Sequence, residues 1–298
     1  MSKEVKFKKM EEIIMIAFKI FLALIGIVLF VSILQFGVNI HPPRYYDSDT
    51  PSNYGLEYEN VSFVTSDKIK IRGWLITSKS ANGTVIIGHG YPFNKGNILP
   101  VAKFLYPDYN LLFYDHRYFG ESEGKITTAG LREVEDVKAT ISFVQERFGK
   151  EEPISLYGFS LSAPAILMAK PEVKAIIAES AYANLERVVE HIFERFGIFK
   201  FPFVKVTNML SLIIFGVHPK EVSPALSIKE IDIPVLIIHG EKDTQIPAEN
   251  AYILKKNNPK AELWIAKNAD HGQVYALYKD EYESRIKNFL EEHMQKTK

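Results

Sequence analysis

Hydrophobic and polar residues follow two different patterns between Tyr58 and the C-terminus. They alternate from Tyr58 to Thr77, which predicts two antiparallel strands that turn at Ser66-Asp67. Farther along the chain, short and continuous apolar runs recur at positions 84–90, 110–117, 153–160, 173–180, 234–243 and 261–268. Continuous apolar runs of this length are typical of strands that are buried on both faces of a parallel sheet.

Amphipathic helical patterns separate most of these strands. The spacing of apolar residues predicts helices at 129–149 and 248–258, and a last helix from Glu281 to about Gln295. Strands that alternate with helices predict an α/β fold, in which helices cover both faces of a mostly parallel eight-stranded sheet. We expect this domain to occupy residues 58–298.

One connection is longer than a crossover between parallel strands requires. The segment at about 181–230 is rich in aromatic residues and predicts a small helical cap. Aromatic side chains commonly bury against one another, but they can also wall an apolar acyl pocket or enter a nearby bilayer. The residues concerned are Phe193, Phe196, Phe199, Phe201 and Phe203.

The N-terminal part of the chain contains a long uncharged stretch. Residues 20–38 carry only two polar side chains, Ser32 and Gln35, and a helix of about 20 apolar residues can cross a bilayer. We therefore predict a short basic segment at 1–12, a transmembrane anchor at 13–38 and a linker at 39–57. A cleaved signal peptide and a buried core helix are the alternatives, although no Ala-x-Ala-like cleavage site follows the stretch.

Basic residues are placed unevenly around this stretch. Lys3, Lys6, Lys8 and Lys9 precede it, whereas Arg44 is the only Lys or Arg between residues 39 and 67. An excess of basic residues marks the cytoplasmic side of a membrane helix. We expect a single-pass membrane protein that contacts the lipid bilayer through its N-terminal helix, with residues 58–298 on the extracytoplasmic side.

The composition excludes several classes of function. The 298 residues include 36 Lys+Arg and 36 Asp+Glu, so no overall positive charge favours nucleic acid as a partner. The absence of cysteine excludes a cysteine nucleophile, disulfide bonds and thiolate metal sites. His89, His116, His239 and His271 follow different strands without the close spacing of a zinc site, so we expect no metal and no cofactor.

Residues capable of acid–base and nucleophilic chemistry follow the predicted strands. Ser160, Asp243 and His271 follow three different apolar runs, in this order along the chain. Ligands bind at the carboxyl ends of the strands in an open parallel sheet, so we expect these residues to meet there. A serine nucleophile needs an imidazole to accept its proton, and the imidazole needs a carboxylate to orient it. Glu179 is an alternative acid, and a serine such as Ser160 can also serve as a helix N-cap.

Two motifs strengthen this interpretation. The sequence Gly158-Phe159-Ser160-Leu161-Ser162 is nearly the Gly-x-Ser-x-Gly elbow of serine hydrolases, and "YDHRYFGESEG" at 114–124 is similar to an Asp-x-Arg-Gly-x-Gly-x-Ser loop. With these motifs, the chain from about residue 58 to its end resembles the α/β-hydrolase superfamily. It resembles the membrane-anchored, esterase-like branch, which is similar to serine aminopeptidases and monoacylglycerol lipases.

The resemblance implies a role for each candidate residue. Ser160 corresponds to the nucleophile, Asp243 to the orienting acid and His271 to the general base. By position, the backbone N–H groups of Tyr91 and Leu161 are the expected donors of an oxyanion hole. Caps at this place in the family overhang the nucleophile, which favours a pocket wall for the cap aromatics.

The chain departs from the family pattern at two positions. Ser162 stands where the elbow has its last glycine, and Tyr118 stands where the loop has its first glycine. We expect the small side chain of Ser162 to fit with a modest shift of the helix, and the variant Ser162→Gly to keep its activity.

We therefore expect a serine hydrolase that cleaves an ester of a hydrophobic acyl substrate through an acyl-enzyme, with a thioester or an amide as related substrates. An acyltransferase would use the same three residues with an alcohol or an amine in place of water. A non-catalytic binding protein would keep the fold without the chemistry.

Overall fold

The computed structural model of the protein describes residues 3–46 and 49–294. Its centre is an eight-stranded sheet with the strand order β1-β2-β4-β3-β5-β6-β7-β8. The strands are β1 (Glu59–Val64), β2 (Lys70–Ile76), β3 (Thr84–Gly88), β4 (Asn110–Tyr114), β5 (Ile154–Phe159), β6 (Ala175–Glu179), β7 (Val235–Gly240) and β8 (Glu262–Ala266).

The direction of the strands agrees with the sequence pattern. β2 runs antiparallel to both of its neighbours, β1 and β4, and all other neighbouring pairs are parallel. The inner strands consist almost entirely of buried residues, because helices cover the sheet on both sides. The prediction of a mostly parallel eight-stranded sheet is therefore confirmed.

Two layers of helices enclose the sheet. Helices α3, α4, α7 and α8 share one hydrophobic core with the sheet, and α2, α9 and α10 share the core on the opposite face. The helices of the domain are α2 (Lys95–Ala102), α3 (Glu133–Phe148), α4 (Ser162–Ala169), α5 (Leu185–Ile192), α6 (Lys200–Phe215), α7 (Pro224–Ser227), α8 (Glu249–Asn257), α9 (Val274–Leu277) and α10 (Lys279–His293). Short 3-10 helices are η1 (Pro51–Tyr54), η2 (Lys103–Leu105), η3 (Glu194–Phe199), η4 (Pro219–Glu221) and η5 (Ile228–Glu230).

The helices predicted at 129–149 and 248–258 correspond to α3 and α8, and local sequence signals mark several helix ends. Asn94 caps α2, since its side chain accepts a hydrogen bond from the N–H of Gly96. Acidic residues occupy the first turn of α3, where they interact favourably with the helix dipole, and Gly149 follows its last turn. The last helix ends at His293, and its expected end at Gln295 lies outside the described residues.

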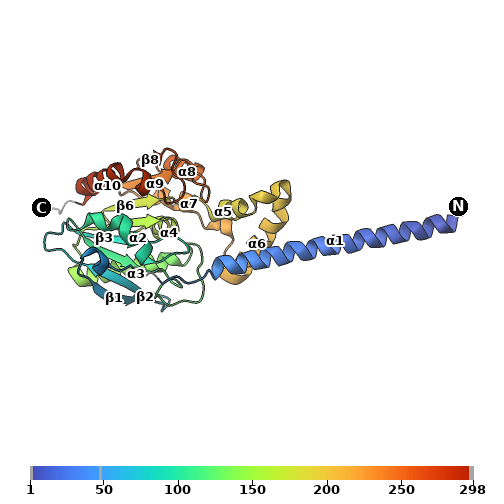
Figure 1. The fold of residues 1–298 in the computed structure, drawn as a ribbon, viewed down its shortest axis with the longest axis horizontal. Coiled ribbons are helices and arrows are strands. Elements are labelled where there is room, and N and C mark those ends of the chain that lie inside the picture. Colours follow the sequence, from blue (N-terminus) through green and yellow to red (C-terminus); the bar gives the residue numbers. More distant parts are fainter. Residues whose placement is uncertain (1–2, 47–48, 295–298) are drawn as a thin grey trace.

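The N-terminal helix α1 (Lys3–Ile40) extends away from the domain as a long rod (Figure 1). It begins well before the predicted anchor boundary at residue 13, because residues 3–12 are mostly good helix formers without proline or glycine. Its most apolar part has a mean hydropathy of 2.9, so the helix is long and apolar enough to cross a membrane. The predicted N-terminal and linker boundaries include residues 1–2 and 47–48, which lie outside the described residues.

The predicted cap is formed mainly by α5, η3 and α6, which lie beside the C-terminal part of α1 (Figure 1). The linker that follows α1 is held against the domain. The Tyr118 hydroxyl donates to the carbonyl of Pro42 at 2.7 Å, the Arg44 guanidinium donates to the carbonyl of Gly124 at 2.8 Å, and the Ile40 carbonyl accepts from the N–H of Thr127. These contacts join the end of α1 directly to the hydrolase-like domain.

Candidate active site

Ser160 lies in the sharp turn between β5 and α4, with a backbone φ of 52°. This left-handed conformation is uncommon for a residue other than glycine, and such strain occurs preferentially at functional sites. The turn is tight because Gly158 faces the start of α4, where a Cβ would lie 2.7 Å from the backbone nitrogen of Ala163. The N–H of Ser160 donates to the Glu179 carbonyl at 2.9 Å, which ties the turn to the end of β6.

The structure brings Ser160, His271 and Asp243 together from three separate connections. The Oγ of Ser160 lies 3.0 Å from Nε2 of His271, and Nδ1 of His271 lies 2.8 Å from Oδ2 of Asp243. His271 follows β8, and Asp243 follows β7. The hydroxyl, the imidazole and the carboxylate thus form one continuous chain of hydrogen bonds, in which a proton can pass from the serine to the histidine.

The environment of Asp243 keeps its carboxyl ionised. Burial alone would raise the pKa of Asp243, but contacts with His239 and His271 and the N–H of Ile246 lower it by more, so that it lies well below its usual range. Its Oδ1 accepts hydrogen bonds from the N–H groups of Gln245 and Ile246 at 3.0 and 2.7 Å. The carboxylate is therefore held in place on one side by the backbone while its other oxygen faces His271.

Glu179, the alternative acid, has different partners. Its Oε2 accepts hydrogen bonds from the hydroxyls of Tyr157 and Tyr282 at 2.7 and 2.6 Å. Burial raises the pKa of Glu179 despite these two hydrogen bonds. The structure therefore places Asp243, and not Glu179, in hydrogen-bond contact with His271.

The two expected oxyanion donors lie beside Ser160. Leu161 directly precedes α4, and Tyr91 belongs to the loop that follows β3; both line the same cavity as Ser160. Within residues 3–46 and 49–294, neither N–H donates to another backbone carbonyl. Gly90 allows the two segments to approach, since a Cβ there would lie 2.7 Å from the ring of Phe159.

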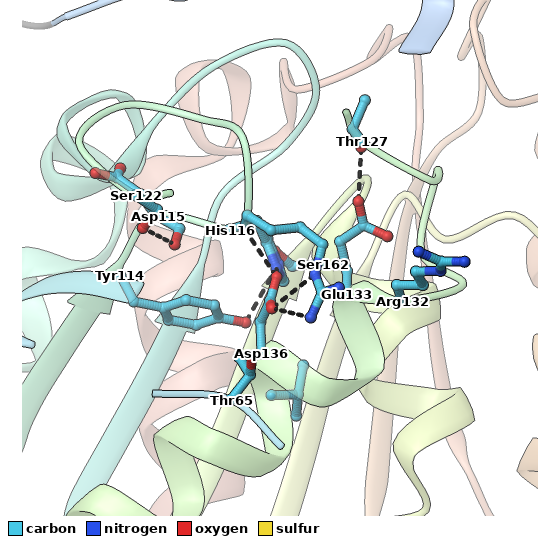
Figure 2. A network of polar contacts seen from close by, with 12 residues as sticks. Thr65, Tyr114, Asp115, His116, Ser122, Thr127, Arg132, Glu133, Asp136 and Ser162 are labelled. Carbon is cyan, nitrogen blue, oxygen red and sulfur yellow. Dashed lines mark hydrogen bonds and ion pairs between the residues drawn. The ribbon is translucent and has the colours of Figure 1, made fainter. Parts of the chain in front are cut away.

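Ser162 has more partners than a small space-filling residue needs, and Figure 2 shows it beside one of them, His116. Its buried hydroxyl donates to the carbonyl of His89 at 2.6 Å, and its Oγ lies 2.7 Å from Nε2 of His116. Gly88 leaves the room for this side chain, because a Cβ at position 88 would lie 2.7 Å from the Cβ of Ser162. The hydroxyl therefore connects α4 with the end of β3, and this contact argues against the expectation that Ser162→Gly keeps its activity.

His116 continues this buried network to the start of α3 (Figure 2). Its Nδ1 lies 3.2 Å from Oδ2 of Asp136, whose carboxylate also accepts hydrogen bonds from the backbone N–H and the guanidinium of Arg117. Arg117 in turn forms an ion pair with Asp67 at 2.6 Å. A second serine, histidine and aspartate are thus connected behind the elbow, without exposure to solvent.

The loop at 114–124 is tied to the scaffold through its charged residues. Asp115 accepts hydrogen bonds from the backbone and the ammonium group of Lys95 at 2.8 and 2.6 Å. Tyr118 adopts a φ of 73°, a conformation that favours glycine, and its ring lies 4.8 Å from the guanidinium of Arg44. The tyrosine at this position therefore joins the loop to the linker behind α1.

An apolar cavity of about 390 Å³ begins at Ser160 and extends under the cap. This volume is within the usual range for small-molecule sites. Its walls include Val188 and Ile192 from α5, Phe215 from α6, and Phe36 and Ile40 from α1.

The cap aromatics divide into three groups, which corrects the expectation that all five wall a pocket. Phe193 lines the cavity. Phe196 and Phe203 stack on each other at 4.7 Å inside the cap, and Phe199 and Phe201 are exposed. The predicted pocket wall therefore holds for one phenylalanine, and the structure adds Phe215 to it.

A second cavity, of about 520 Å³, adjoins the first on the side of His271. Tyr91 and Gln245 line both cavities. The lining of the second cavity is more polar and includes Glu179 and Tyr275. In the part of the chain that the structure describes, no group of three or more His, Asp and Glu residues has the arrangement of a metal site.

The strand order and the serine at the end of β5 define the class of the protein. The solved structure of the esterase Pf2001 from Pyrococcus furiosus is 28% identical in sequence, has a TM-score of 0.72, and is matched over 86% of this chain and 98% of that chain. The model of the prolyl oligopeptidase family matches residues 215–297. The protein is a serine hydrolase of the α/β-hydrolase superfamily, as the resemblance predicted. Within the superfamily it belongs to the X-Pro dipeptidyl-peptidase family (S15), whose model matches residues 50–212, more than half of the chain.

Two relatives extend this comparison. The chain and the uncharacterized protein YqkD of Bacillus subtilis are 29% identical over 230 residues. This aligned region covers 74% of this chain and 75% of that protein. The chain and an uncharacterized membrane protein of Saccharomyces cerevisiae are 24% identical over 249 residues. This aligned region covers 81% of this chain and 82% of that protein. The second relative is described as a membrane protein, and in this chain helix α1 is long and apolar enough to cross a membrane.

Sequence reasoning missed the residues of α1 that line the first cavity. Gln35, Phe36, Asn39 and Ile40 all contribute to its wall. A signal was present, because Ser32, Gln35 and Asn39 are polar, occur at helical spacing and therefore share one face of an otherwise apolar helix.

Proposed function

We propose that the protein hydrolyses an ester of a hydrophobic acyl substrate, with Ser160 as nucleophile, His271 as general base and Asp243 as orienting acid. The observation that carries this proposal is the chain of hydrogen bonds from Ser160 through His271 to Asp243 at the mouth of an apolar cavity. A thioester or an amide would react at the same site by the same steps.

The reaction would proceed through an acyl-enzyme. Nε2 of His271 takes the proton of Ser160 as Oγ attacks the acyl carbonyl, and Asp243 stabilises the resulting imidazolium. The negative charge on the carbonyl oxygen is stabilised by the N–H groups of Tyr91 and Leu161, each worth about 2.7–4 kcal/mol of the barrier. His271 then protonates the leaving alcohol, accepts a proton from water, and returns it to Ser160 as the acid product departs.

The two cavities support a division between the acyl and the leaving group. The first cavity is largely apolar and contains Ser160, so it fits the acyl chain. The second contains His271, which has to protonate the leaving group, and its lining, more polar than that of the first, fits an alcohol and the attacking water.

A fluorophosphonate probe tests the nucleophile directly. We expect the wild-type protein to be labelled and Ser160→Ala to remain unlabelled, because the probe reacts with an activated serine. A wild-type protein that is not labelled, or a Ser160→Ala variant labelled equally, would exclude the proposed site.

A peptidase is a second candidate, because both matched families are peptidase families. Comparing kcat/KM for an aryl ester with that for the matching aryl amide separates the two activities. An acyltransferase would give acylated alcohol or amine when these compete with water, and a binding protein would give no product at all.

We also propose that residues 13–38 anchor the chain in the membrane as a single span, with the N-terminus in the cytoplasm. Residues 39–57 would then be the linker and residues 58–298 the extracytoplasmic hydrolase domain, with the cap at about 181–230. The positive charges of Lys3, Lys6, Lys8 and Lys9 at the start of α1 support this orientation.

A further inference from the structure

Helix α6 has the reverse of the usual pattern for a surface helix. Its polar residues Thr207, Asn208 and Ser211 are buried beside Phe203 and Val204, whereas its exposed face is apolar apart from Lys205. The exposed residues are Phe201, Met209, Leu212, Ile213 and Ile214. A helix at the surface of a water-soluble domain places its apolar face inward, so this pattern indicates a helix that faces lipid.

Helix α6 lies against the uncharged part of α1. The rings of Phe36 and Phe215 are 5.6 Å apart, and Oγ of Ser32 donates to the carbonyl of Phe203 at 3.4 Å. Val28 and Val31 of α1 pack against the hydrophobic core of the cap. The contact region from Val28 to Phe36 covers about 12 Å of the helix axis, which is less than half the thickness of the hydrocarbon core of a bilayer.

These contacts determine where the cap lies when α1 spans a membrane. Because α6 packs beside the last turns of the apolar stretch, the exposed face of α6 has to enter the same leaflet. Lys200 and Lys205 are the basic residues of α6 and lie in its first two turns, so they are the charges that entry of this helix into the leaflet has to accommodate.

The same two helices form walls of the cavity that begins at Ser160. Helix α1 contributes Phe36, Asn39 and Ile40, and α6 contributes Ser211 and Phe215. An acyl chain in this cavity would thus contact the membrane anchor itself. The anchor is part of the binding site and not only a tether.

Two buried hydroxyl groups line the cavity without a hydrogen-bond partner in the described part of the chain. They are Oγ of Ser180 and Oγ1 of Thr207. A polar group near the ester of a lipid can hydrogen-bond with such a hydroxyl, whereas the rest of the cavity offers apolar contact to the chain.

We propose that the substrate is a long-chain acyl ester that resides in the bilayer, and that its acyl chain reaches Ser160 through the cavity walled by α1 and α6. This proposal rests on the proposed function of Ser160. It names the substrate class, because an acyl chain that moves from the leaflet into this cavity stays in apolar surroundings throughout.

The test uses the full-length protein in phosphatidylcholine vesicles with two fluorogenic esters of one alcohol, 4-methylumbelliferyl palmitate and 4-methylumbelliferyl acetate. We expect the kcat/KM for palmitate to exceed that for acetate at least tenfold. The variant Asn39→Trp, which fills the cavity from the side of α1, should lower this palmitate-to-acetate ratio at least tenfold. The matched control Leu34→Trp lies on the exposed face of α1 and should leave the ratio unchanged.

A second pair of variants tests the membrane face of α6. Leu212 on α6 and Leu226 on α7 are both exposed, at 49% and 58%. We expect Leu212→Lys to lower the palmitate-to-acetate ratio in vesicles at least fivefold, because a charge on this face opposes its entry into the leaflet. Leu226→Lys should leave the ratio at the wild-type value.

Fluorophosphonate labelling of every variant separates the two proposals. If the proteins are labelled but prefer acetate, the membrane-lipid substrate is excluded while the serine hydrolase site stands. The same conclusion follows if the palmitate-to-acetate ratio is equal in Asn39→Trp and Leu34→Trp. Wild-type protein that is neither labelled nor active on either ester would overturn both.

Discussion

Ser162 connects the two backbone segments that we propose as oxyanion donors. It directly follows Leu161, and its hydroxyl donates to the carbonyl of His89, two residues before Tyr91. The hydrogen bond therefore fixes the distance between the start of α4 and the loop after β3. The family glycine has no atom that can form this contact, so the departure from the motif adds a polar connection behind the nucleophile.

We expect Ser162→Ala to lower both stability and turnover. The loss of the hydroxyl leaves the buried His89 carbonyl and the His116 Nε2 without this partner, which costs about 1–3 kcal/mol of unfolding free energy. The kcat should fall about tenfold with little change in KM, because the donors would move while the acyl cavity stays intact. Thermal unfolding and steady-state kinetics measure the two effects, and an unchanged kcat would limit Ser162 to a structural role.

Asp243 and Glu179 should respond differently to neutral substitution. Asp243→Asn removes the charge that faces His271 and favours the wrong imidazole tautomer, so we expect kcat to fall about ten-thousand-fold. Glu179→Gln keeps an oxygen acceptor for the two tyrosines and should change kcat less than about tenfold. A larger loss from the Glu179 variant would assign the acid role to Glu179.

The raised pKa of Glu179 also predicts a pH dependence of stability. Above pH 4.5 the carboxyl loses its proton in the unfolded chain but retains it in the folded protein, so rising pH favours unfolding until the folded group also ionises. Glu179→Gln cannot ionise, and its melting temperature should rise relative to wild type as the pH increases above 4.5. If the difference in melting temperature between Glu179→Gln and wild type stays constant as the pH rises, the pKa of Glu179 is not raised in the folded protein.

At the scale of elements, β3 and α4 approach each other at Gly88 and Ser162. A Cβ added at position 88 would lie 2.7 Å from the Cβ of Ser162 and 2.9 Å from the hydroxyl of Tyr114. We expect Gly88→Ala to destabilise the fold by about 1–3 kcal/mol through overpacking. In the Ser162→Gly background, Gly88→Ala should lower the free energy of unfolding by less. If Gly88→Ala lowers the melting temperature equally in the two backgrounds, contact with Ser162 is not the cause of the destabilisation.

The cap shows how an element acquires a role that its composition does not reveal. Its aromatic residues indicated a pocket wall, yet Phe196 and Phe203 form the interior of the cap, and Phe199 and Phe201 face outward. The distinction follows from the orientation of α6 against α1. Polar residues of both helices, such as Ser32 and Thr207, are turned away from the surface, as expected for helices that pack in lipid.

For the whole molecule, the contacts of the linker hold the hydrolase domain close to the end of α1, the helix that we propose as the membrane anchor. Tyr118 binds the Pro42 carbonyl, and Arg44 binds the Gly124 carbonyl, so few residues separate α1 from the domain. If α1 and α6 enter the membrane as we propose, the domain would be held next to the leaflet that contains α6, and Ser160 would lie near substrates of low solubility in water.

The proposed orientation predicts the outcome of proteolysis on intact cells. Protease added outside should digest residues 58–298, because this domain would lie on the extracytoplasmic side. A cytoplasmic protein of the same cells should remain intact as a control for permeability. If the domain is protected in intact cells and digested only after lysis, residues 58–298 lie in the cytoplasm and the proposed topology is wrong.

The sequence by itself determined the strands, the helices α1, α3, α8 and α10, and the order of Ser160, Asp243 and His271. Hydrophobic periodicity and short motifs report on local structure, and a parallel sheet brings the ends of its strands to one edge. Only the tertiary structure decided that Asp243 contacts His271 while Glu179 contacts two tyrosines, that Ser162 binds the His89 carbonyl, and that α1 walls the cavity. These pairings join side chains from segments far apart in the chain, and their geometry depends on how the helices and loops pack against the sheet.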